Sequence, residues 1–203
     1  MRNRLLFIAG VISLGVAQGC AHTSMTSMAS PDMPRQGFRN ILVYAGFVDL
    51  GVRQATELTF VSSNTSESVR FVAAHQLFFP GRQYTSEEMA ATLREKQIDA
   101  SLLIAAGQQG TSSSYIPPTF TSSCTVWNSS TGCQQATTTT SGGQAVQKPW
   151  AQFTAQLFDA HTGKVVWFAT ANTGGNAFAS STTLATSMAN ETLSRLRADG
   201  VIR

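Results

Sequence analysis

The sequence lacks any apolar run long enough to cross a bilayer as a helix, which requires about 20 residues. The longest candidate, Leu5–Val16, has roughly half that length. The sequence also lacks a surplus of charge once Arg2 and Arg4, which precede this run, are set aside: 14 basic residues become 12, against 11 acidic ones. A near-neutral chain has no electrostatic footprint for nucleic acid or anionic lipid, so we expect no nucleic-acid partner.

Motifs of catalysis and of metal binding are also missing. No Gly-x-Ser-x-Gly elbow occurs. The stretch Thr162-Gly163-Lys164 is not a phosphate-binding loop, because Phe158 stands where the earlier glycine is required and Val165 where a hydroxyl residue is required. The three histidines show no metal-ligand spacing: His22, His75 and His161.

Three carboxylates, Asp49, Glu57 and Asp99, fall near the ends of expected strands, where they could meet as an acidic cluster. Such residues more often cap helices and form surface pairs, and this is the interpretation that we favour. We therefore expect no catalytic residues, no metal and no cofactor.

The first twenty residues have the layout of an export signal, with a basic segment, the apolar run and then small residues. The stretch Ala17-Gln18-Gly19-Cys20 resembles the signal of bacterial lipoproteins. In that family the signal is cleaved before the cysteine, the thiol is diacylated and the new amino group is acylated. The alternative is an ordinary signal peptide cut near Ala17 or Gly19, with Cys20 incidental.

The lipoprotein resemblance implies a division of the chain into three parts. Residues 1–19 are the signal peptide, and Cys20 carries the lipid, whose two chains give a stable anchor. The next residue is Ala21 rather than aspartate, which implies sorting to the outer membrane. Residues 20–39 are rich in Ser, Thr and Met and lack periodicity, which predicts a flexible tether. Residues 40–203 then form a single periplasmic domain with an insertion at 107–148.

Hydrophobic patterns predict an α/β domain. We expect strands at 40–47, 69–74, 99–106, 150–158 and 165–171, and helices at 49–63, 85–96 and 181–197. The order is β-α-β-α-β, the insertion, then β-β-α, which implies a mixed sheet of about five strands with three helices. Two helix faces are expected to be apolar: Val52, Ala55, Leu58 and Val61 on the first, and Leu184, Met188, Thr192 and Leu196 on the last.

The insertion, residues 107–148, is dominated by Ser, Thr, Gln and Gly. A structureless segment of this length is unusual in a compact domain, and we predict an extended hairpin that turns at Asn128-Ser129. This turn would place Cys124 opposite Cys133. In an oxidising compartment the pair predicts a disulfide, and the alternatives are two free thiols or half of a metal site.

Three aromatic residues of the insertion are candidates for partner contact: Tyr115, Phe120 and Trp127. Aromatic side chains on a stiffened loop make good contact anchors. The alternative is that the loop folds back and buries them.

The domain resembles the periplasmic α/β domains of bacterial envelope lipoproteins. The group includes the curli-secretion lipoprotein family, the TolB amino-terminal domain and lipoprotein activators of penicillin-binding proteins. The matching stretches are strand 40–47 followed by Arg53 and Glu57, Ile98-Asp99-Ala100 before an apolar strand, and the strand–turn–strand Leu157–Trp167. These are turn and core motifs, so they imply a fold and not an activity.

These features together indicate a non-catalytic outer-membrane lipoprotein that works through protein–protein contact with an envelope protein or with its own copies. The alternative, implied by the curli resemblance, is a secretion-channel subunit that oligomerises through the 107–148 hairpin. A lipid-facing strand alternates apolar and polar residues over about ten positions. Phe120, Ser122, Cys124 and Val126 show this pattern only weakly.

Overall fold

The computed structural model describes residues 19–64, 66, 68–128 and 132–202, and for 124–128 and 132–137 it describes the backbone but no side chains. The signal peptide expected at 1–19 lies, apart from Gly19, outside the described residues. Twelve elements follow one another: β1 (Ala21–Ala29), β2 (Asn40–Ala45), α1 (Leu50–Ser62), β3 (Arg70–Ala73), α2 (Ala74–Leu77), α3 (Ser86–Glu95), β4 (Ala100–Ile116), β5 (Thr119–Asn128), β6 (Gly132–Ser141), β7 (Gln144–Asp159), β8 (Val165–Gly175) and α4 (Ser181–Ala198).

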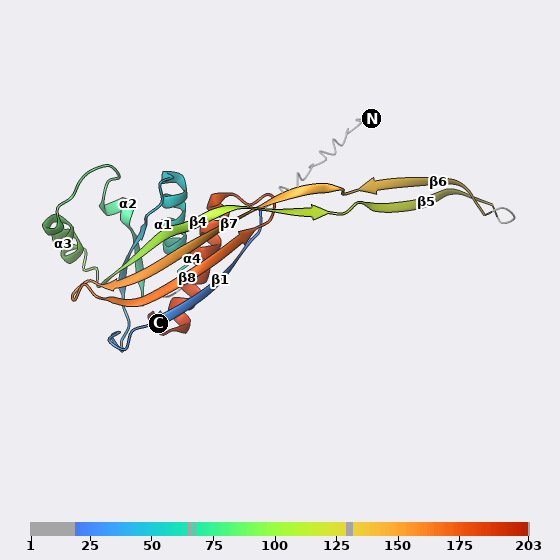
Figure 1. The fold of residues 1–203 in the computed structure, drawn as a ribbon. Coiled ribbons are helices and arrows are strands. Elements are labelled where there is room, and N and C mark those ends of the chain that lie inside the picture. Colours follow the sequence, from blue (N-terminus) through green and yellow to red (C-terminus); the bar gives the residue numbers. More distant parts are fainter. Residues whose placement is uncertain (1–18, 65, 67, 129–131, 203) are drawn as a thin grey trace, which may run out of the picture.

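Six strands form one mixed sheet in the order β1-β8-β7-β4-β2-β3, and β5 and β6 form a separate two-stranded ribbon (Figure 1). β2 runs parallel to β3 and β4, while the other neighbours in the sheet are antiparallel. The expected α/β class and mixed sheet are confirmed. The expected count of about five strands is one too low because β1 joins the edge, and the four-residue α2 is a helix that the sequence did not predict.

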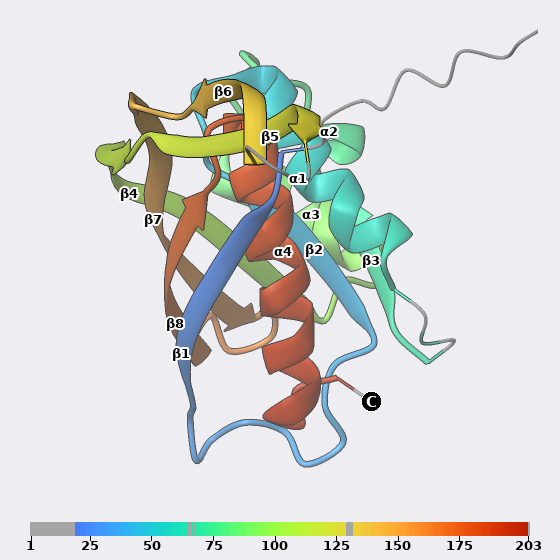
Figure 2. The ribbon, with the colours of Figure 1, turned by 90° about the vertical axis from the view of Figure 1, so that its right-hand side faces the viewer.

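Helices α1 and α4 pack beside each other on one face of the sheet and enclose the main core (Figure 2). The predicted face of α4 is confirmed: Leu184, Met188, Thr192 and Leu196 are all buried. The helix begins with a capping box made by Ser180 and Thr183, and it ends before Gly200, whose positive φ of 71° closes the last turn. Strand β7 alternates as expected, with Ala151, Phe153, Ala155 and Leu157 inward.

The predicted apolar face of α1 is wrong. Leu58 and Val61 are exposed, and the residues that α1 buries are Thr56, Glu57 and Phe60. A pattern of apolar residues fails here because the carboxylate of Glu57 finds polar partners inside the fold, which removes most of the cost of burying it. The capping role that we favoured for Asp49 is confirmed, since its side chain accepts a hydrogen bond from the backbone N–H of Val52.

The flexible tether expected at 20–39 is also wrong. Residues Ala21–Ala29 form β1, which pairs with β8 along its whole length from Ala21↔Gly175 to Ala29↔Trp167. Alternate side chains of β1 turn inward: Met25 enters the core, and the hydroxyl of Thr23 lies 2.9 Å from both Thr173 Oγ1 and Ser187 Oγ. Short polar residues without an obvious period therefore form an edge strand. The backbone groups of β8 pair with them, and a hydroxyl group of α4 is a partner for Thr23.

The link from β1 to β2 is held in place as well. Phe38 is buried, and its backbone N–H donates to the carbonyl of Val201 at 3.1 Å. Ser27 Oγ donates to Asp199 Oδ2 at 2.6 Å, and Trp167 Nε1 donates to the same oxygen at 2.7 Å. Asp199, directly after α4, thus links β1 to β8 through its carboxylate.

The insertion forms the extended hairpin that the sequence predicts. β4 and β7 continue beyond the body of the sheet and stay paired as far as Ile116↔Gln144, with one irregularity between Ala106 and Gln109. The ribbon then continues as β5 and β6 (Figure 1). At the junction between the two parts of the ribbon, Gly142 has a φ of 97°, and a Cβ there would lie 2.5 Å from the carbonyl oxygen of Pro117. Position 142 therefore requires glycine.

Candidate interaction surface at one end of the sheet

Strand direction gathers several connections at one end of the sheet. β2, β3, β4 and β8 run toward this end of the sheet, and β1 and β7 run away from it. We call it the anchor end and define it as Cys20 with residues 46–50, 106–111, 149–151 and 175–181. The hairpin leaves the body here, next to the start of β1 (Figure 1).

Cys20, the predicted lipid site, is exposed and lies directly before β1. Its carbonyl oxygen accepts a hydrogen bond from the backbone N–H of Asn176 at 2.9 Å. The next residue, Ala21, is already in register with Gly175 of β8. A lipid on Cys20 would thus begin at the sheet itself, with no spacer of free chain between the membrane and the domain.

The loops of the anchor end expose apolar side chains. Val48 is fully exposed, Leu50 is 52% exposed and Phe178 is 71% exposed. Between the β2–α1 loop, the root of the hairpin and the start of α4 lies a cavity of about 910 Å³. Its apolar lining includes Phe47, Val48, Trp150, Phe153 and Leu184.

The aromatic residues predicted as contact anchors are placed along the hairpin. Tyr115 is 64% exposed on β4 and Phe120 is 66% exposed on β5, so these two are not folded back onto the body. Ile116, which lies between them, is also exposed. The side chain of Trp127 lies outside the described residues, and its role stays a prediction.

The register of the hairpin corrects the expected pairing of the cysteines. Cys124 stands opposite Ala136, and Cys133 stands opposite Trp127. The offset arises because the ladder closes at Asn128↔Gly132 and not at the predicted Asn128-Ser129 turn, which moves the partner of each cysteine by three positions. A cross-strand disulfide requires its two residues to face each other, so this register does not favour the bridge. The cysteine side chains lie outside the described ones, and the bridge itself stays a prediction.

The composition of the hairpin carries a further signal, the absence of charge. From Ala100 to Gln147 the chain contains no Asp, Glu, Lys, Arg or His. Exposed ribbons normally carry charges, especially lysine, that prevent their edges from pairing with other chains. In the part of the chain that the structure describes, β5 and β6 pair only with each other. An uncharged ribbon with two free edges and exposed aromatic residues is chemically suited to protein contact.

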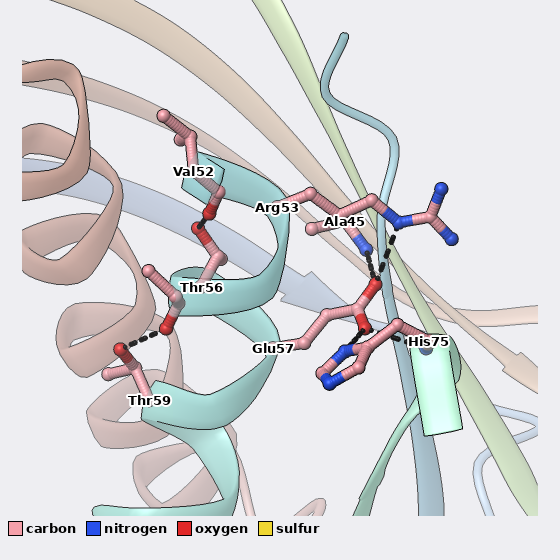
Figure 3. Close-up of polar contacts among 8 residues, drawn as sticks. Ala45, Val52, Arg53, Thr56, Glu57, Thr59 and His75 are labelled. Atoms are coloured by element: carbon pink, nitrogen blue, oxygen red, sulfur yellow. Dashed lines mark hydrogen bonds and ion pairs between the residues drawn. The ribbon is translucent and has the colours of Figure 1, made fainter. Parts of the chain in front are cut away.

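A second polar cluster is buried in the body around Glu57, whose side chain is fully inaccessible (Figure 3). Its Oε1 accepts from the backbone N–H of Ala45 at 3.1 Å and from Arg53 Nε at 3.2 Å. Its Oε2 accepts from the backbone N–H of His75 at 2.9 Å and lies 2.6 Å from His75 Nδ1. The guanidinium of Arg53 also stacks over the ring of Tyr44, 4.5 Å from its centroid.

The Glu57 cluster has the residue types of an acid–base site but the geometry of a structural clamp. Both carboxylate oxygens are already occupied by donors from the cluster, and the contacts join α1 to the end of β2 and to the start of α2. Paired burial of this kind compensates the desolvation of the carboxylate. His75, which shows no metal-ligand spacing in the sequence, is the structural partner of Glu57.

The other two carboxylates do not join Glu57. Asp49 caps α1, while Asp99 accepts from the backbone N–H groups of Arg39 and Asn40 at 2.8 and 3.0 Å, at the opposite end of β2. Among the described residues no three His, Cys, Asp or Glu side chains are grouped as metal ligands. In the same part of the chain, no helix has both the length and the apolar character needed to cross a membrane.

Comparison with known proteins finds likeness only among solved structures. No protein-family model and no curated protein sequence matches the chain. A PelC dodecamer from Paraburkholderia phytofirmans aligns over 85% of this chain and 96% of its own, with 15% identity and a TM-score of 0.47. Lipoprotein GNA1162 from Neisseria meningitidis aligns over 79% of this chain and 99% of its own, with 13% identity and a TM-score of 0.42. Likeness at this level says nothing about what this chain binds or does.

Proposed function

We propose that this protein is a non-catalytic lipoprotein of the outer membrane, anchored through Cys20, that acts by protein–protein contact through its hairpin. The observation that supports the proposal most directly is the hairpin itself. It projects from the body, contains no charged residue between positions 107 and 147, and exposes Tyr115 and Phe120. At about 3.3 Å per residue, the paired stretch from Gln109 to Asn128 reaches roughly 60 Å from the sheet.

The Ser/Thr-rich strands supply backbone edges, and the aromatic side chains supply apolar contact area. An exposed strand edge offers a row of N–H and C=O groups to a partner strand, while side chains at alternate positions give specificity. Ordering cost is small because the ribbon is already formed before binding. The body contributes position, since it holds the hairpin root at the same end as the lipid site.

The test is site-specific photocrosslinking in living cells of the full-length lipoprotein. A photoreactive residue replaces Phe120 on the hairpin, and the matched control replaces Met28, which is 75% exposed at the far end of β1. We expect a discrete adduct at position 120 that is absent at position 28, and its mass identifies either an envelope protein or a second copy. Adducts at position 28 alone, or no adduct at position 120, would overturn the contact role of the hairpin.

The alternative function is a subunit of a curli-type secretion channel that oligomerises through the hairpin. The free edges of β5 and β6 favour it, because strands of neighbouring copies can pair there. The weak alternation of Phe120, Ser122, Cys124 and Val126 counts against it. Mass determination after detergent extraction separates the two functions: a large homogeneous ring supports the channel subunit, and a monomer excludes it.

A further inference from the structure

We infer that the anchor end is a membrane-docking face, whose exposed apolar loops enter the interface of the bilayer that holds the lipid of Cys20. The inference rests on the proposed lipid anchor and adds an orientation to it. A flexible tether would let the domain tumble freely, and a domain attached directly at the sheet has a restricted set of orientations.

The first step of the argument is the distance between lipid and domain. Cys20 is bonded to Asn176 through its backbone, and the ladder between β1 and β8 starts at Ala21. Since no free residues separate the thiol from the sheet, acyl chains inserted in a leaflet bring the loops around Cys20 to the headgroup region. The occupant of this surface is therefore a lipid bilayer.

The second step is the chemistry of those loops. Phe178 follows Asn176 by two residues, Val48 lies on the β2–α1 loop beside the 910 Å³ cavity, and Leu50 is the first residue of α1. Three exposed apolar side chains at one end of a small domain are suited to a surface that enters lipid. Only isolated charges accompany them: Asp49, which caps α1, and Lys148 at the hairpin root. The face is thus suited to zwitterionic headgroups and does not depend on anionic lipid.

The third step concerns the hairpin. It leaves the body at the same end, so docking of this face directs the hairpin toward the bilayer and away from the open periplasm (Figure 1). Tyr115 and Ile116 are exposed on this segment, and aromatic side chains are favoured in the interfacial region. The partner proposed for the hairpin must accordingly be a protein in or directly against the membrane.

The experiment uses the mature lipidated protein in vesicles of phosphatidylcholine, a fraction of which carries bromine near the top of its acyl chains. Tryptophan replaces one exposed apolar residue in each of two variants, Phe178→Trp at the anchor end and Met28→Trp at the far end of β1. Both side chains are largely exposed, 71% and 75%, so neither substitution disturbs the core. The nearly equal exposure makes the two positions a matched pair. The native protein supplies the background from its own tryptophans.

We expect bromine to remove most of the added fluorescence in Phe178→Trp and little of it in Met28→Trp. Equal quenching at both positions, or no added quenching at position 178, would overturn the docking face. Thermal unfolding of each variant confirms that it is folded. The intact mass of the purified protein tests the anchor separately: a Cys20 without lipid refutes the proposed function, whereas a lipidated Phe178→Trp variant whose added fluorescence is not quenched refutes only the orientation.

Discussion

The hairpin and β1 are built from similar residues but have opposite surroundings. Both are short of charge and rich in Ser and Thr, and both meet the anchor end. β1 is fixed by a full ladder with β8, by buried Met25 and by the hydroxyl contacts of Thr23. The hairpin has only its own ladder, and its described side chains are almost all exposed. A strand of this composition thus joins the body where a neighbouring strand and a helix pack against it, and it projects from the body where they are missing.

The largest expected effect comes from the fully buried carboxylate of Glu57. Glu57→Ala leaves the donors of Ala45, Arg53 and His75 without their acceptor, and loss of one partner from a buried ion pair costs about 3–5 kcal/mol. The free energy of unfolding in urea measures it. The control Glu191→Ala removes the partly exposed pair with Arg195 and should cost no more than about 1 kcal/mol. Equal effects of the two changes would refute the clamp.

The next largest effect tests whether β1 belongs to the body. Met25→Ala removes a side chain that is only 5% exposed, and such truncations typically cost about 2–5 kcal/mol. Met28→Ala, three positions along the same strand but exposed, should change the stability by no more than about 0.5 kcal/mol. If both substitutions were neutral in urea unfolding, residues 20–29 would be a tether after all.

The hairpin should contribute little to the stability of the body. Deletion of residues 110–147 joins Gln109 to Lys148 and leaves residues 148–150 as a three-residue connection before Ala151, the register partner of Gln109. We expect the unfolding free energy to change by no more than about 1 kcal/mol, because the deleted segment adds nothing to the main core. Native-state hydrogen exchange on the intact protein gives a second measurement, with faster exchange in 119–128 than in 151–158. Collapse of the deletion variant would contradict this separation.

The smallest effect concerns an exposed carboxylate on the body. A side-chain hydrogen bond from Lys96, with its charge as the second cause, lowers the pKa of Glu95 below its ordinary value. The contribution to stability is therefore present above the unfolded pKa of the carboxyl group and is lost as the pH falls through the folded one. Lys96→Met should raise the pKa of Glu95, as an NMR titration would show, while Lys164→Met leaves it unchanged.

Local patterns were sufficient for the elements whose burial is purely apolar. The alternation in β7 and the four-residue repeat of α4 predicted both the elements and their buried faces, because one side of each meets the core. The long hairpin followed from the composition of 107–148. Of the contact candidates, the exposure of Tyr115 and Phe120 required the structure, since the sequence was equally compatible with a loop folded back.

Polar burial was the main source of error. The face of α1 was misassigned because Glu57 is buried by donors that lie on β2 and α2, up to 18 residues along the chain. β1 was missed because its inward positions are occupied by Thr23 and Met25, whose partners come from β8 and α4, about 150 residues away. The predicted register of the cysteines was wrong for a local reason: the ladder closes at Asn128↔Gly132, three positions away from the register that a turn at Asn128-Ser129 requires.

The sequence by itself determined the signal-like layout of the first twenty residues with its final cysteine, the α/β class and the presence of a long uncharged hairpin, since each depends on composition or on a short-range period. Only the tertiary structure decided that Cys20 adjoins the sheet, that the hairpin leaves from the same end, and that Phe178 and Val48 stand beside them. These features depend on strand direction and pairing between distant segments, and such long-range hydrogen-bond ladders leave no period in the sequence.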